Sequence, residues 1–195
     1  MDDYKSIAAF SEGLYKESGS RFIALAYPVE TVEEVKEILT RLRAEYHDAR
    51  HVCFAYRLGA DGSEFRSSDD GEPSGTAGRP ILGQIDSKGL SDVLVVVVRY
   101  FGGILLGVPG LIRAYKTSSA DALENAPIIA KVSRKSVTFT FDYLQMNSIM
   151  KLIKDSDVKI VSQECNLQCT YTVAVRTSEA DAFAEKIDKI VNNRY

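Results

Sequence analysis

The chain has 195 residues and a net charge of −3; hydrophobic residues make up 45% and charged residues 26% of it. Such a composition supports a packed core and excludes an intrinsically disordered chain and a strongly basic nucleic-acid-binding module. The apolar run 93–98 is far shorter than the roughly 20 residues of a membrane span, and residues 1–4 lack the features of a signal peptide. We therefore expect a cytoplasmic protein with no membrane partner.

Residues 20–26 predict a first strand, closed by Tyr27-Pro28. A capping-box sequence, Thr31-Val32-Glu33-Glu34, then begins a helix that extends to about Tyr46, with apolar residues at steps of three and four. Residues 52–58 form the next predicted strand, and a turn at 59–62 leads into its partner at 63–68.

A glycine-rich segment, residues 69–78, precedes a short predicted helix that reaches Ile85 and has Pro80 in its first turn. The strand predicted at 92–100 contains four consecutive valines, which is typical of a strand covered on both faces. A second glycine-bearing loop, 101–107, leads into a helix predicted at 109–124. The residues expected on its inner face are Leu111, Ile112, Tyr115, Ala122 and Leu123.

Pro127 and the basic segment 131–135 mark a predicted boundary between domains 1–130 and 134–195. Strands at 136–142, 158–165 and 167–176 and helices at 143–154 and 178–191 give the second domain the order β-α-β-β-α. This order predicts a ferredoxin-like arrangement without its last strand. The predicted fold class is therefore α+β with two domains.

Three cysteines, Cys53, Cys165 and Cys169, form an odd set without the spacing of a disulfide framework. In a cytoplasmic protein we expect reduced thiols. A zinc site at Cys165 and Cys169 is an alternative, but no histidine follows them, and positions in or beside a strand are preferred.

Two long motifs carry a resemblance to a known family. Residues 69–80 read DDGEPSGTAGRP and residues 95–103 read VVVVRYFGG; LIRAY at 111–115, SRFI at 20–23 and HVCFAYR at 51–57 continue the match. In this order and spacing the chain resembles the IMPACT/YigZ family over nearly its whole length.

The resemblance implies an N-terminal α/β sandwich similar to domain IV of elongation factor G and to the GHMP kinases, and a C-terminal domain similar to domain V of that factor. Eukaryotic relatives regulate translation by interfering with activation of an amino-acid-starvation kinase, through a ribosome-associated activator. The expected partner is thus the ribosome, RNA or a translation-associated protein, and no cofactor is expected.

This chain departs from the usual family sequence in the second loop. Leu105 replaces a lysine, and Val108 and Pro109 replace a threonine and a glycine. These changes remove a positive charge and one amide from the loop best placed to meet a phosphate.

Glycine loops beside helix starts can expose backbone amides to an anion, and nearby cations can bind phosphates of RNA. Turns and close packing are the alternative role of the glycines. Aromatic residues after a buried strand can stack on bases, or can belong to the core. The candidate binding residues are Asp69, Asp70, Glu72, Ser74, Gly75, Thr76, Gly78, Arg79, Arg99, Tyr100, Phe101, Gly102, Gly103, Gly107, Gly110, Arg113 and Lys116.

The acidic residues Asp69, Asp70 and Glu72 can meet a basic partner or a cation, or can accept hydrogen bonds from nearby amides. For His47 and His51, four residues apart, a structural or partner-facing role is preferred to metal binding. We identify no catalytic residue, because Ser74 lies in no nucleophile elbow.

Three functional hypotheses follow. The first is a translation-associated module that contacts the ribosome, RNA or a ribosome-bound protein through both glycine loops. The second is a regulator that binds only protein, through the acidic cluster. The third is a nucleotide-binding protein or enzyme on a GHMP-kinase-like fold, although no P-loop or dinucleotide fingerprint is present.

Overall fold

The structure is a computed structural model, and residues 2–192 are described. They form two compact units, one of residues 3–131 and one of residues 132–192 together with Asp2. Each unit has its own hydrophobic core, and both combine strands with helices, so the α+β prediction is confirmed.

The first unit is built on an antiparallel five-stranded sheet with the order β2-β3-β6-β4-β5. Its central strand is buried on both faces, as the valine run predicts; residues 93–98 are all fully buried. The strands are β2 (Ser11–Glu17), β3 (Ser20–Pro28), β4 (His51–Leu58), β5 (Glu64–Ser68) and β6 (Val93–Tyr100).

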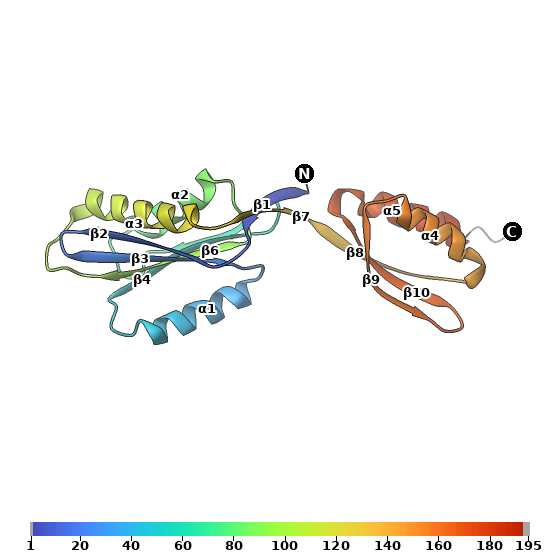
Figure 1. Ribbon diagram of the computed structural model, residues 1–195, viewed down its shortest axis with the longest axis horizontal. Coiled ribbons are helices and arrows are strands. Elements are labelled where there is room, and N and C mark those ends of the chain that lie inside the picture. Colours follow the sequence, from blue (N-terminus) through green and yellow to red (C-terminus); the bar gives the residue numbers. More distant parts are fainter. Residues whose placement is uncertain (1, 193–195) are drawn as a thin grey trace. The chain divides into compact units, whose positions relative to one another are not determined.

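Helices cover both faces of this sheet (Figure 1). On one face lies α1 (Val32–Glu45), which buries Val35 and Leu42 and begins with the predicted capping box between Thr31 and Glu34. On the other face lie α2 (Gly78–Ser87) and α3 (Gly107–Glu124). Two apolar layers, one on each face, therefore hold the sheet.

Three strands of this region were not predicted. They are β2 and the two members of a separate small sheet, β1 (Asp3–Ile7) and β7 (Ile128–Val132). β2 contains Gly13, where an added Cβ would lie 2.3 Å from the Ala122 nitrogen, so its glycine serves close packing on α3. The expected inward position of Ile112 is wrong, because this side chain on α3 is 38% exposed.

The second unit has the predicted order β-α-β-β-α. Its antiparallel sheet has the strand order β8-β10-β9, and two helices, α4 and α5, cover one face (Figure 1). Leu144 lies before α4 in a 3-10 turn, Tyr143–Gln145, and is 97% exposed, outside the core. The elements are β8 (Arg134–Phe141), α4 (Met146–Lys154), β9 (Val158–Cys165), β10 (Cys169–Arg176) and α5 (Ala180–Asn192).

The expectation of reduced thiols is wrong for one pair of cysteines. Cys165 and Cys169 form a disulfide between the end of β9 and the start of β10. These residues are direct cross-strand partners with a Cα–Cα distance of 4.1 Å, so the hairpin register brings the two sulfurs together. Cys53 remains a buried free thiol.

Candidate functional site

The two glycine-bearing segments meet at one end of the five-stranded sheet. β5 and β6 each pair antiparallel with β4, so they run in the same direction. Their C-terminal ends therefore lie beside the start of β4, at His51. The segment 69–77 follows β5, and the segment 101–106 follows β6, which places both at this edge.

The carboxylate of Asp69 fixes the first segment. It accepts hydrogen bonds from the backbone N–H groups of Gly75 at 2.8 Å, Ala77 at 3.0 Å and Gly78 at 2.8 Å. Burial opposes its ionisation, but these three hydrogen bonds outweigh the effect and hold the pKa of Asp69 below its ordinary value. Asp69 thus occupies the N-terminus of α2, where an external anion would otherwise bind.

A buried ion pair links the first segment to the end of β6. Arg99 Nη1 lies 2.6 Å from Glu72 Oε1, and the hydroxyl of Tyr115 donates to the same oxygen at 2.7 Å. The Arg99 guanidinium lies between two rings, 5.5 Å from the centroid of Phe22 and 5.7 Å from that of Phe101. The Arg99 Nε–H group is buried without a hydrogen-bond partner in the described part of the chain.

His51 faces the same ion pair from the start of β4. Its Nδ1 lies 2.8 Å from the carbonyl oxygen of Asp70, which can only accept, so Nδ1 carries a proton. Its Nε2 lies 4.0 Å from Glu72 Oε2.

A cavity of about 420 Å³ opens where these groups meet. One side is polar and contains the Arg99–Glu72 pair with His51 and Arg50, whereas the other side is apolar and comes from the second segment and the start of α3. Its lining residues are Arg50, His51, Gly71, Glu72, Pro73, Arg99, Phe101, Leu105, Leu106, Gly107, Val108 and Leu111.

Only four of the sequence-predicted site residues line this cavity: Glu72, Arg99, Phe101 and Gly107. Asp70 instead pairs with Arg43 and accepts the N–H of Val52.

The other predicted residues serve the loops or lie elsewhere on the surface. Tyr100 donates to Asp48, and Arg113 pairs with Glu17. Gly102 packs against the backbone of Gly19, where a Cβ would approach to 2.0 Å. Ser74, Gly75 and Thr76 lie in the first segment, and Gly103 lies in the second. Gly78 and the exposed Arg79 belong to α2, and Gly110 and the exposed Lys116 belong to α3.

Apart from Phe101 and Gly107, sequence reasoning missed the apolar half of the cavity, and it missed Arg50 at the rim. Leu105 and Val108 differ from the usual family sequence. The sequence signal that could have identified them is their position as apolar residues between glycines, and both are exposed in the structure. Arg50 carried no signal, because only the pairing of β4 with β6 brings it to the glycine segments.

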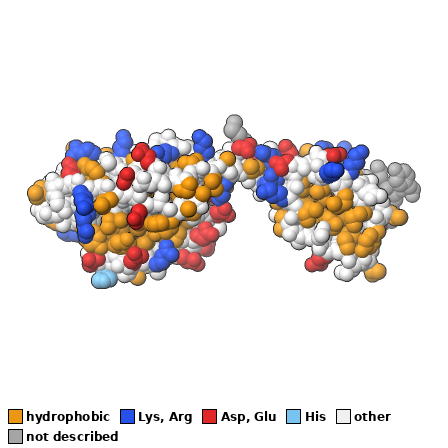
Figure 2. Space-filling view, in the orientation of Figure 1, with side chains coloured by type: hydrophobic (Ala, Val, Ile, Leu, Met, Phe, Trp, Pro, Cys, Tyr) orange, Lys and Arg blue, Asp and Glu red, His pale blue; other side chains and the backbone are white. Residues whose placement is uncertain are grey.

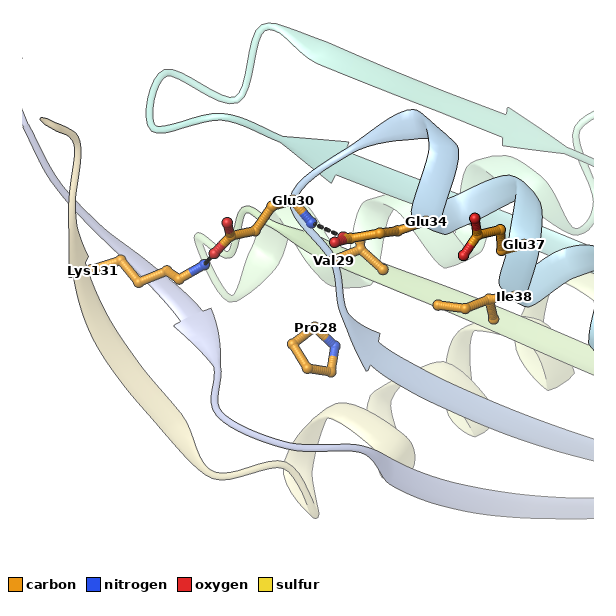
Figure 3. Close-up of a pocket in the computed structure, with 7 residues that line it drawn as sticks. All are labelled: Pro28, Val29, Glu30, Glu34, Glu37, Ile38 and Lys131. Carbon is orange, nitrogen blue, oxygen red and sulfur yellow. Dashed lines mark hydrogen bonds and ion pairs between the residues drawn. The ribbon is translucent and has the colours of Figure 1, made fainter. Parts of the chain in front are cut away.

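A second cavity in this unit, about 410 Å³, lies beside the N-terminus of α1 (Figure 3). Three of its four charged side chains already have partners within the chain: Glu34 accepts a hydrogen bond from the N–H of Glu30, and Glu30 pairs with Lys131. It lies away from both glycine segments, so we do not assign it a ligand.

Charges of both signs are interspersed over the face that Figure 2 shows. Among residues 2–192, no helix is long and apolar enough to cross a bilayer, and no group of three or more potential metal ligands is found.

Comparison with known proteins finds a matching family, similar sequences and a similar solved structure. The Impact N-terminal domain family matches residues 18–123, which contain every lining residue. IMPACT family member YigZ of Escherichia coli is 37% identical over 86% of this chain and 83% of that protein. IMPACT family member YvyE of Bacillus subtilis is 32% identical over 90% and 81%, respectively. A crystal structure described as that of a hypothetical protein aligns with a TM-score of 0.74 at 34% identity, over 98% of this chain and 94% of the other.

Proposed function

Because the chain belongs to the IMPACT family, as its motifs indicated, we propose that it is a regulatory binding protein linked to translation. Residues 1–130 would supply the contact surface, and the cavity between the two glycine-bearing segments would be the place of contact. The second domain, 134–195, would act with it in the cytoplasm. We further propose that the two domains resemble domains IV and V of elongation factor G.

One observation supports this proposal above the others. The two longest motifs of the family resemblance, 69–80 and 95–103, supply both members of the buried Arg99–Glu72 pair. This pair forms the floor of a cavity whose other wall is exposed and apolar. Buried ion pairs contribute little net stability, so a partly open cavity above one suggests a binding role.

Cys53 and Tyr115 lie in the core near the Arg99–Glu72 pair and do not line the cavity, and their protonation favours binding over catalysis. Burial raises the pKa of the Cys53 thiol to about 12, so no thiolate nucleophile forms near neutral pH. Burial, with Cys53 and Glu72 beside it, also raises the pKa of Tyr115 far above its ordinary value. Both groups therefore stay protonated and serve as hydrogen-bonding members of the core.

Sedimentation of cell lysate tests the proposal. On a sucrose gradient, tagged wild-type protein is expected to co-sediment with ribosomes or with complexes that contain translation factors. The Leu105→Ser variant is expected to remain at the top of the gradient. Leu144→Ser is a matched control, because Leu144 is 97% exposed on the other unit. Equal sedimentation of all three proteins outside translation fractions would refute the proposed function.

A further inference from the structure

The apolar wall of the cavity, formed by the second segment and the start of α3, is largely exposed. Leu105 is 86% exposed, Val108 51% and Phe101 44%, and Ile104 beside them is 60% exposed. They lie close together in the chain, and three of them line one cavity with the half-buried Leu106 and the buried Leu111. Contiguous exposed apolar residues next to a concavity are typical of protein-binding surfaces.

The lining of the cavity has one more cation than anions. Of the lining residues, Arg50 and Arg99 are cations and Glu72 is the anion, and Glu72 is already paired with Arg99. Arg50 is exposed at the rim. Leu106 at the N-cap of α3 gives no side-chain hydrogen bond to the first turn, so the positive end of an 18-residue helix also faces this region.

Other features of the two segments make a phosphate a poor occupant. The amides at the start of α2 are already bonded to Asp69, and Pro109 has no amide to donate in the first turn of α3. The lysine that the family usually carries in the second loop is Leu105 here. One rim arginine beside four apolar side chains complements a carboxylate attached to an apolar group better than it complements a nucleic-acid backbone.

We infer that the cavity receives a large apolar side chain from a peptide segment of a partner protein, with an acidic residue beside it that pairs with Arg50. The apolar side chain would pack against Phe101, Leu105 and Val108, and the carboxylate would lie near the first turn of α3. This inference rests on the proposed function, since it specifies the chemistry of the partner that the same cavity would bind. The protein-binding feature is then this cavity and not the acidic cluster, because Asp69 and Glu72 already bind groups within the chain.

A display selection tests the inference without a known partner. The full-length purified protein is used as bait for a library of random peptides of one length. The expected consensus is an aromatic or large aliphatic residue next to Asp or Glu, whereas basic peptides are not enriched. A synthetic peptide with this consensus should lose at least tenfold in affinity when Arg50→Glu or Leu105→Lys is introduced.

Matched surface variants make the result specific. Arg66→Glu and Leu144→Lys change exposed residues outside the cavity and are expected to leave peptide affinity unchanged. A fluorescent single-stranded RNA is measured in parallel. Tighter binding of RNA than of any selected peptide, or a consensus without acidic residues, would overturn the inference.

The two proposals fail in different experiments. If no peptide is enriched but Leu105→Ser still abolishes sedimentation with translation fractions, the inference is wrong and the proposed function stands. If peptides bind in the cavity but sedimentation does not depend on it, the proposed function is wrong.

Discussion

Arg99 and Glu72 form an ion pair of 2.6 Å whose two side chains are only 7% and 3% exposed. Glu72 lies in the loop after β5 and Arg99 lies in β6, 27 residues away in the chain. The pair therefore ties the first glycine-bearing segment to the end of β6, and so fixes the distance across the floor of the cavity.

Breaking this pair on one side should destabilise the first unit strongly. Arg99→Met or Glu72→Leu alone is expected to lower the free energy of unfolding by about 3–5 kcal/mol, because each leaves a buried charged group without its partner. The combination Arg99→Met with Glu72→Leu should recover part of this loss. Urea denaturation of the four proteins measures the coupling, and strictly additive losses would contradict a direct interaction.

Asp69 should make stability dependent on acid pH. Its pKa is lowered in the folded protein, so its contribution is present above the unfolded value of about 4 and is lost as pH falls through the folded value. Asp69→Asn is expected to unfold about 2–3 kcal/mol more easily at pH 7, where the carboxylate bonds three amides. The difference from wild type should shrink below about pH 4.

Acid and urea titrations of both proteins check this pH dependence. Asp188→Asn, an exposed change on α5, is the control and should stay within about 0.5 kcal/mol at all pH values. A constant difference between wild type and Asp69→Asn from pH 7 to pH 3 would show that the charge of Asp69 is not involved.

Much of the fold follows from the sequence because its signals are local. The capping box at Thr31, the valine run of β6 and the β-α-β-β-α order of the second unit each depend on neighbouring residues. β2 and β7 carry no such signal. They exist because α3 and β1, distant in the sequence, provide surfaces and hydrogen-bonding edges for them.

The candidate site was only partly predictable for the same reason. Glycine motifs located Glu72, Arg99 and Phe101, but spacing cannot reveal that Asp69 would bond the loop amides expected to be open. Arg50 and Leu105 belong to the site only through the meeting of β4, β5 and β6 at one edge. The disulfide was missed because it depends on strand register, whereas the expectation of reduced thiols depended on a cytoplasmic location.

Thiol chemistry tests both cysteine assignments. Native protein without reductant should show no thiol reactive with Ellman's reagent at pH 8, because the Cys53 pKa is about 12 and the other two cysteines are bonded. Denaturation should release one thiol, and reduction as well should release all three. A reactive thiol in the native protein that persists in Cys53→Ala would contradict the disulfide.

Two glycines should respond oppositely to alanine. At Gly102 an added Cβ would meet the Gly19 backbone at 2.0 Å, so Gly102→Ala should destabilise the protein by about 2–3 kcal/mol. At Gly83, inside α2, no atom lies within 4 Å of the added Cβ, and Gly83→Ala should stabilise by up to about 1 kcal/mol. Thermal unfolding of both variants measures this, and equal shifts would contradict the close approach at Gly102.

Site-specific photo-crosslinking in living cells tests the central claim most directly. A photoreactive amino acid replaces Leu105 at the cavity or, as the control, Leu144 on the other unit, and the crosslinked products are identified by mass spectrometry. We predict that position 105 crosslinks to a component of the translation machinery and that position 144 does not. The same products from both positions, or none from position 105, would contradict a binding role for this cavity.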